Sequence, residues 1–153
     1  MTSYHVRIED AKSRFSASHF LVDHNKCSRI HGHNYNVSVE LTGPLNKDYF
    51  VVDFFDLKQR LRKITEKMDH HVLIPGKSND IEIEEKSGQI LVNMKQKHYE
   101  FPKSDVIILP LKATTAELIS KYIYDFIKEE FPDFPIIVEV SESKASIAKY
   151  GDF

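Results

Sequence analysis

The stretch HGHNYNVSVEL, residues 31–41, decides how the rest of the chain is interpreted. Its residues alternate: one set reads His, His, Tyr, Val, Val, Leu, and the other set is mostly polar. Because successive side chains of a β-strand point to opposite faces of a sheet, this alternation predicts a half-buried strand. One face of that strand would start with His31 and His33 and continue as an apolar row.

The preceding segment adds a third histidine. Residues 4–22 alternate as a long strand with an interruption near residues 9–12, and His19 shares a face with Phe15, Ala17 and Leu21. If the two strands pair antiparallel, His19, His31 and His33 can converge. Three imidazole ligands with a fourth position open are typical of catalytic zinc. The alternative is a set of hydrogen-bonded histidines on a half-buried sheet, which would leave several polar atoms to satisfy.

Two helices follow from apolar residues at intervals of three and four. The first is marked by Phe54, Leu57, Leu61, Ile64 and Met68, with Asp53 as a plausible N-cap. The second begins at TTAE, where Thr114 and Glu117 have the spacing of a capping box. Both stripes predict amphipathic helices that pack against a sheet.

The other segments predict further strands. Short strands are expected at YFVV (49–52) and DVIIL (105–109), a hairpin at 80–94 around KSGQ, and two closing strands at 135–142 and 145–151. This order predicts one α+β domain over 1–153, with an antiparallel sheet and both helices on one face.

Composition narrows the function classes. The 153 residues carry a net charge of −2, which gives no electrostatic case for a nucleic-acid or membrane partner. No apolar stretch approaches the roughly 20 residues that span a bilayer. The N-terminus has charges where a signal peptide needs an apolar run, and the single cysteine cannot form an internal disulfide. We therefore expect a cytoplasmic protein.

That cysteine stands in an unusual place. Cys27 is flanked by Lys26, Ser28 and Arg29, in the loop that joins the two histidine-bearing strands. Positive charge or a metal nearby lowers the pKa of a thiol and makes thiolate available near neutral pH. A lone cysteine is more often a small buried apolar residue, so both interpretations stay open.

Acidic residues supply further candidates. Asp69 and His70 stand side by side in MDHH, where a carboxylate can orient an imidazole, or where histidines simply end a helix favourably. Glu142 continues the apolar face of Ile136, Val138 and Val140. A carboxylate there is either an exposed strand end or an acceptor for two parallel ligand donors.

Taken together, these residues resemble a known family. FSASHFL, CSRIHGHNY, VVDFFDLK, MDHHVL, TTAELIS and VSES occur in the order found in the 6-pyruvoyl-tetrahydropterin synthase / 6-carboxy-tetrahydropterin synthase family. The resemblance covers roughly residues 4–74 and 106–150, and the segment 75–105 is longer than is usual there.

The resemblance implies a tunnelling fold: a four-stranded antiparallel sheet with two helices, here with an inserted hairpin. Three sheets would close into a barrel and two trimers would stack into a homohexamer with sites between subunits. The substrate would be 7,8-dihydroneopterin triphosphate. The implied roles are zinc binding by His19, His31 and His33; proton transfer by Cys27, Asp69 and His70; and pterin binding by Glu142 with Glu117 or Thr115.

Within this family, the residues around the cysteine differ between branches that make different products. The branch that makes 6-carboxy-tetrahydropterin, on the way to deazaguanine-modified nucleosides (queuosine and archaeosine), typically has three residues between the cysteine and HGH, as in CSRIHGH. The 6-pyruvoyl branch, which leads to tetrahydrobiopterin, typically has a longer gap. A third branch has a glutamate in this loop, and none stands between Cys27 and His31. A zinc-bound pterin- or purine-binding protein without turnover stays as a further alternative.

Overall fold

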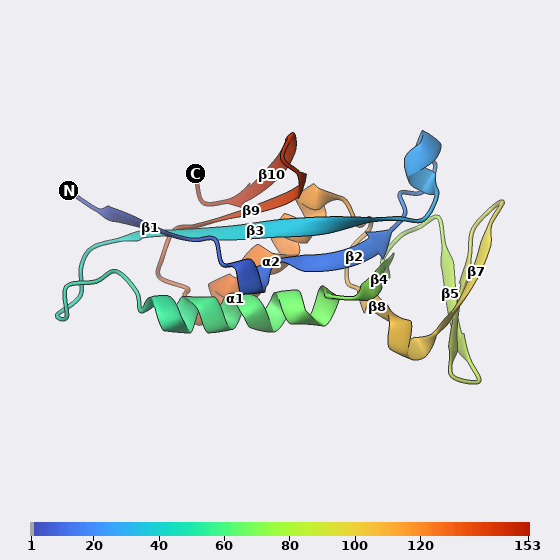
Figure 1. Ribbon diagram of the computed structural model, residues 1–153, viewed down its shortest axis with the longest axis horizontal. Coiled ribbons are helices and arrows are strands. Elements are labelled where there is room, and N and C mark those ends of the chain that lie inside the picture. Colours follow the sequence, from blue (N-terminus) through green and yellow to red (C-terminus); the bar gives the residue numbers. More distant parts are fainter. Residues whose placement is uncertain (1) are drawn as a thin grey trace.

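The computed structural model describes residues 2–153 and shows two helices covering one face of a large sheet (Figure 1). The seven strands of this sheet run in the order β10-β9-β3-β2-β4-β8, with β1 also paired to β3. They are β1 (Tyr4–Ile8), β2 (Phe15–His19), β3 (His31–Gly43), β4 (His71–Pro75), β8 (Val106–Leu109), β9 (Ile136–Ser143) and β10 (Ser146–Gly151). The α+β class is confirmed. The four-stranded antiparallel sheet is wrong, because β4 runs parallel to β2 and β8 runs parallel to β4.

The long strand β3 organises the sheet. The predicted interruption near residues 9–12 is a short 3₁₀ turn, η1 (Ala11–Ser13), so β1 pairs with the second half of β3 and β2 with the first half. In this antiparallel register His19 lies opposite His31, and Ala17 lies opposite His33. The pairing that the histidine argument required is therefore present.

Both predicted helices form, as α1 (Phe54–Met68) and α2 (Ala116–Glu130). The side chain of Asp53 accepts a 2.8 Å hydrogen bond from the Phe55 amide, which confirms it as the N-cap of α1. The cap of α2 is Thr115, whose hydroxyl accepts from the Leu118 amide, so the predicted Thr114–Glu117 capping box is wrong. Within residues 2–153, neither helix has the length and apolar character needed to cross a membrane.

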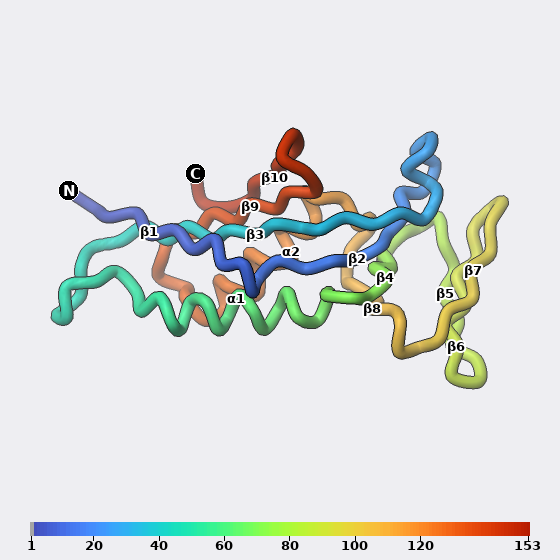
Figure 2. The backbone as a smooth tube through the Cα atoms, in the orientation of Figure 1, coloured from blue at the N-terminus to red at the C-terminus, as the bar shows by residue number. Residues whose placement is uncertain are grey.

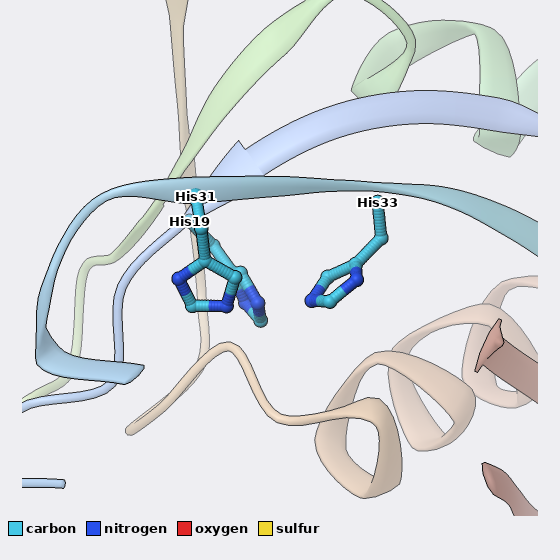
Figure 3. Close-up of side chains that lie close together, drawn as sticks. All are labelled: His19, His31 and His33. Atoms are coloured by element: carbon cyan, nitrogen blue, oxygen red, sulfur yellow. The ribbon is translucent and has the colours of Figure 1, made fainter. Parts of the chain in front are cut away.

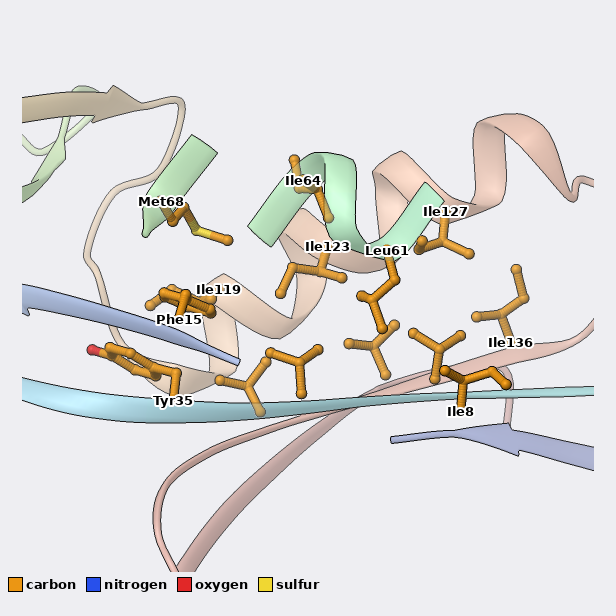
Figure 4. Packing of buried hydrophobic residues seen from close by; sticks show 14 of the residues in the cluster. Ile8, Phe15, Tyr35, Leu61, Ile64, Met68, Ile119, Ile123, Ile127 and Ile136 are labelled. Carbon is orange, nitrogen blue, oxygen red and sulfur yellow. The ribbon is translucent and has the colours of Figure 1, made fainter. Parts of the chain in front are cut away.

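The core lies between these helices and the sheet (Figure 4). The apolar face of β3 contributes Val37, Val39 and Leu41, all at most 1% exposed. Leu61 and Ile123 meet this face from α1 and α2. Each such aliphatic side chain gains roughly 1.5–3 kcal/mol from burial, so this face fixes which way β3 points and where its histidines emerge.

The segment 75–105 folds as a sheet of its own. The predicted hairpin is confirmed by β5 (Glu82–Lys86) and β6 (Gln89–Asn93), and a third strand, β7 (His98–Pro102), pairs with β6. This sheet, the insert sheet, lies at the opposite end of the molecule from the N-terminus (Figure 2). The chain then passes through η3 (Lys103–Asp105) into β8. The short strand predicted at 49–52 is wrong: these residues form bends without a strand, in which Val51 and Val52 are buried.

Candidate metal centre and active site

Three imidazoles converge at one end of the sheet. His19 ends β2, and His31 and His33 begin β3, so all three side chains leave the same face and point toward one another (Figure 3). Each offers a ring nitrogen, and these three nitrogens lie within 4.8 Å of one another. The predicted convergence is confirmed. The set can hold one metal ion with three nitrogen ligands.

Backbone carbonyls orient two of the rings. His19 Nδ1 lies 2.8 Å from the carbonyl oxygen of Thr114, and His31 Nδ1 lies 2.7 Å from that of Arg29. A ring that donates Nδ1–H to a carbonyl leaves its Nε2 lone pair for a metal, which is the usual outer-shell arrangement of a metal-binding histidine. Both rings are therefore held in the tautomer that a metal requires.

The unpaired nitrogens fit a metal. In the part of the chain that the structure describes, Nε2 of His19 and Nε2 of His33 are buried and have no hydrogen-bond partner. Burial, followed by the neighbouring histidines, lowers the pKa of His19 to about 4 despite its bond to Thr114. His19 is therefore neutral near pH 7, as a metal ligand is. A buried nitrogen without a partner costs roughly 1–3 kcal/mol, a cost that a bound metal removes.

Glu142 lies at the same site. Its two carboxylate oxygens are 3.7 Å from His19 Nε2 and 3.8 Å from His33 Nε2. The side chain is 27% exposed, so it stands at the mouth of the centre rather than inside the core. Glu142 therefore lies beside the triad, and its role in pterin binding stays a prediction.

Tyr35 was assigned no role from the sequence. It is fully buried two residues after His33, and its ring centroid lies 5.5 Å from that of His33. Its hydroxyl has no partner among the described residues, and burial, followed by the Glu142 charge, raises the pKa of Tyr35 far above its ordinary value. The sequence does place Tyr35 on the same face of the strand 31–41 as His31 and His33, which could have indicated a site residue. That position was instead assigned to the apolar core.

Asp69 and His70 form a pair, but not at the histidine centre. The Asp69 carboxylate lies 3.0 Å from His70 Nδ1 and accepts a 2.9 Å bond from the Ser16 amide. Burial alone would raise the pKa of Asp69, but the hydrogen bonds from the Ser16 amide and His70 outweigh burial and lower the pKa of Asp69. His70 has a left-handed φ of 59° and an 82% exposed side chain.

His70 of this pair borders a cavity on the opposite face of the sheet. The cavity has a volume of about 460 Å³. Four of its lining residues, Ser16, Ser18, Gly32 and Asn34, alternate along β2 and β3 with the three histidines. The others are Ala17, His33, His70, His71, Val72 and Asp105. A Cβ on Gly32 would lie 3.2 Å from the Ala17 carbonyl oxygen, so glycine permits the close approach of β3 to β2 at this point. One chain therefore does not bring His70 to the same face as the triad.

The remaining predicted residues lie in the loop between β2 and β3 and at the start of α2. Half-buried Cys27 sits in the 3₁₀ turn η2 (Asn25–Ser28), between the strands that carry His19 and His31. Thr115 follows the residue whose carbonyl orients His19. Glu117 is exposed in the first turn of α2. Thr114 was missed: it is buried and supplies both that carbonyl and a hydroxyl bond to Phe20.

Comparison with known proteins identifies the family. The family model described as 6-pyruvoyl tetrahydropterin synthase matches residues 9–152. The chain therefore belongs to the 6-pyruvoyl tetrahydropterin synthase family, as the motifs predicted.

Relatives with the carboxy name and structures with the pyruvoyl name both resemble the chain. A putative 6-carboxy-5,6,7,8-tetrahydropterin synthase of Methanocaldococcus jannaschii is 36% identical over 110 residues, covering 71% of this chain and 68% of that protein. The 6-carboxy-5,6,7,8-tetrahydropterin synthase of Haemophilus influenzae is 28% identical over 141 residues, covering 89% and 92%. Among solved structures, 6-pyruvoyl tetrahydropterin synthase of Plasmodium falciparum superposes with a TM-score of 0.92 at 30% identity, covering 100% and 99%.

Proposed function

We propose that the chain is a zinc-dependent pterin synthase that acts on 7,8-dihydroneopterin triphosphate and water. The reaction would eliminate triphosphate, release the two outer side-chain carbons as acetaldehyde and yield 6-carboxy-5,6,7,8-tetrahydropterin. The observation that carries this proposal is the cluster of three histidine nitrogens, two of them buried without partners, in a member of this family. The names of the M. jannaschii and H. influenzae relatives support the carboxy product. So does the three-residue gap between Cys27 and His31.

Zinc would be held by His19, His31 and His33, whose nitrogen set suits it. When bound, zinc supplies Lewis-acid polarisation of a substrate oxygen. The chain supplies the rest of the environment: the Thr114 and Arg29 carbonyls fix two rings, and the Phe15–Tyr35 stack closes the core beneath the triad.

Proton transfer and pterin binding fall to other side chains. Cys27 as thiolate would take a proton from carbon on the substrate side chain, and His70, oriented by Asp69, would take or return a second proton. Glu142 would accept two parallel hydrogen bonds from the amino and N3–H edge of the pterin. Thr115 or Glu117 would add contacts from the start of α2.

The positions of these groups favour a site shared between subunits. The Asp69–His70 pair lies across the sheet from the triad, so a second chain would have to present its own pair to complete the constellation. In the described residues β10 is paired only with β9 and β8 only with β4, which leaves strand edges for neighbours. A homohexamer of two stacked trimers would close those edges and bring His70 of one subunit to the triad of another.

A second candidate has specific support. The solved structures from P. falciparum and Plasmodium vivax are named 6-pyruvoyl tetrahydropterin synthases, at TM-scores of 0.92 and 0.91. Incubating purified protein with zinc and 7,8-dihydroneopterin triphosphate separates the candidates by the mass of the product. The 6-carboxy mass supports the proposal, and the 6-pyruvoyl mass supports the second candidate. Pterin binding without release of triphosphate would refute both and leave a binding protein.

A further inference from the structure

The insert sheet is attached to the part of the chain that carries the metal ligands. A small apolar cluster joins Ile90 and Val92 of β6 to Ile74 of β4 and to Phe20, the residue after β2. The rings of Phe20 and Tyr99 stack with centroids 5.3 Å apart, and Phe20 directly follows His19. The insert sheet and the turn η2 lie at the same end of the molecule (Figure 1).

Beyond this cluster, one lysine of the insert reaches the cysteine loop, residues 21–30. Lys97 lies in the β6–β7 turn, where its carbonyl accepts a 2.8 Å bond from the Met94 amide. Its ammonium donates to the carbonyl of Ser28 at 2.8 Å and approaches the Ser28 hydroxyl at 3.5 Å. Within residues 2–153 these are the only hydrogen bonds between the insert sheet with its turns and the cysteine loop.

Apolar packing holds the start of the loop, where Val22 packs against this cluster. Further along the loop, a cavity of about 520 Å³ lies between Asn25, Ser28 and the β6–β7 turn. Asp23 and Asn25 adopt left-handed φ values of 57° and 43°, and the 2.8 Å bond from the Leu21 amide to the Cys27 carbonyl closes the loop. The charge-assisted hydrogen bond from the Lys97 ammonium to the carbonyl of Ser28, the residue after Cys27, can therefore hold this loop in one conformation.

We propose that Lys97 is a positioning residue: the insert sheet uses it to hold the cysteine loop, so that the Cys27 thiol stays in place relative to the histidine triad. The inference rests on the proposed function, in which that thiol moves a proton. Proton transfer requires a donor–acceptor distance near hydrogen-bond length, and an error of about 1 Å can cost up to roughly 100-fold in rate.

The test compares Lys97→Met with Lys95→Met, an exposed lysine of the same turn that makes no hydrogen bond to the loop. Amide hydrogen exchange is followed at Leu21, Ser28 and Arg29, whose amides bond within the loop. We expect faster exchange at these amides in Lys97→Met alone. We also expect kcat to fall roughly 10- to 100-fold with KM, metal content and Tm unchanged. Lys97→Arg, which can still donate to the Ser28 carbonyl, should recover much of both losses.

The outcomes separate this inference from the proposed function. Wild-type exchange and kcat in Lys97→Met would overturn it, and so would equal effects in Lys95→Met or faster exchange with unchanged kcat. If the wild-type protein released no triphosphate, the proposed function would fail, and with it the role in turnover. The exchange comparison would then still decide whether Lys97 holds the loop.

Discussion

The carboxylate of Glu142 lies 3.7 Å from Nε2 of His19, although the two residues come from strands at opposite ends of the chain. β9 pairs with β3 along residues 36–41, and its end therefore reaches the level of the triad. The sequence indicated that a carboxylate continued an apolar face, and the fold shows what that face meets. Glu142 borders two of the ring nitrogens that a metal would bind.

Glu142→Gln tests the pterin contact. Gln keeps the shape but replaces one acceptor oxygen with an N–H donor, which would face the amino edge of a pterin. Because each hydrogen bond to a charged group contributes roughly 1.5–3 kcal/mol, we expect pterin affinity to fall at least tenfold. Pterin titration by calorimetry measures this loss.

Metal content in the same variant distinguishes two roles for the carboxylate. The three histidines remain, so zinc stoichiometry and oligomeric state should match the wild type. Unchanged pterin affinity together with lower zinc content would show that Glu142 supports the metal centre and does not bind the pterin.

His33→Ala tests the metal centre. Loss of an outer-shell partner typically weakens metal binding by about 10- to 100-fold, and loss of a direct ligand should exceed that. Zinc per chain after exhaustive dialysis is the measurement, with His98→Ala as the control, since His98 is an exposed residue of the insert. Full zinc occupancy in His33→Ala would contradict the ligand assignment.

The predictable part of the fold followed from local periodicity. The alternation of 31–41 and the register against β2 placed the triad, because side-chain direction in a strand depends only on position. The strand at 106–109 was expected, but β4 (71–75) and the parallel pairing of both strands were missed, because this pairing joins segments that are distant in the sequence and a short apolar run does not reveal it. Thr114 was missed as a site residue because its backbone carbonyl orients His19, and a carbonyl has no sequence signature.

Cys27→Ala should separate chemistry from folding. Alanine keeps the half-buried turn η2 intact and leaves the three histidines in place, so metal content and Tm should not change. Turnover should fall by roughly 10²–10⁴-fold, the usual contribution of a general base. Triphosphate release under saturating substrate measures it, and a wild-type rate would remove Cys27 from the mechanism.

Glu139 supports a pH-dependent part of the stability. The hydrogen bond from Arg7 is the main cause that lowers the pKa of Glu139 from 4.5 to about 2, and Lys149 adds to it against the cost of burial. A lowered folded-state pKa means that the unfolded chain binds more protons between these values. The stabilisation is therefore complete above about pH 4.5 and disappears as the pH falls toward 2.

Glu139→Gln should lower the free energy of unfolding at pH 7 by roughly 1–3 kcal/mol, and the difference from wild type should shrink below pH 4.5. Urea titrations at equal protein concentration measure it, since assembly also contributes to stability. Glu9 gives a matched control: it is 3.6 Å from Arg7 but 55% exposed, so Glu9→Gln should change little. A pH-independent loss in Glu139→Gln would indicate altered packing in place of the ion pair.

The separation of His70 from the triad gives the sharpest test of assembly. If His70 of one subunit serves the triad of another, His33→Ala and His70→Ala homo-oligomers should both be inactive, yet subunit exchange should restore some sites. Random mixing of equal amounts leaves about one quarter of sites with both wild-type groups, so activity near that fraction is expected. Light scattering should report about six times 17.8 kDa for each species. Activity that stays absent after demonstrated subunit exchange would place the triad and His70 in one chain's site, because only a shared site can be rebuilt by exchange. A His70→Ala oligomer with wild-type activity would remove His70 from the reaction.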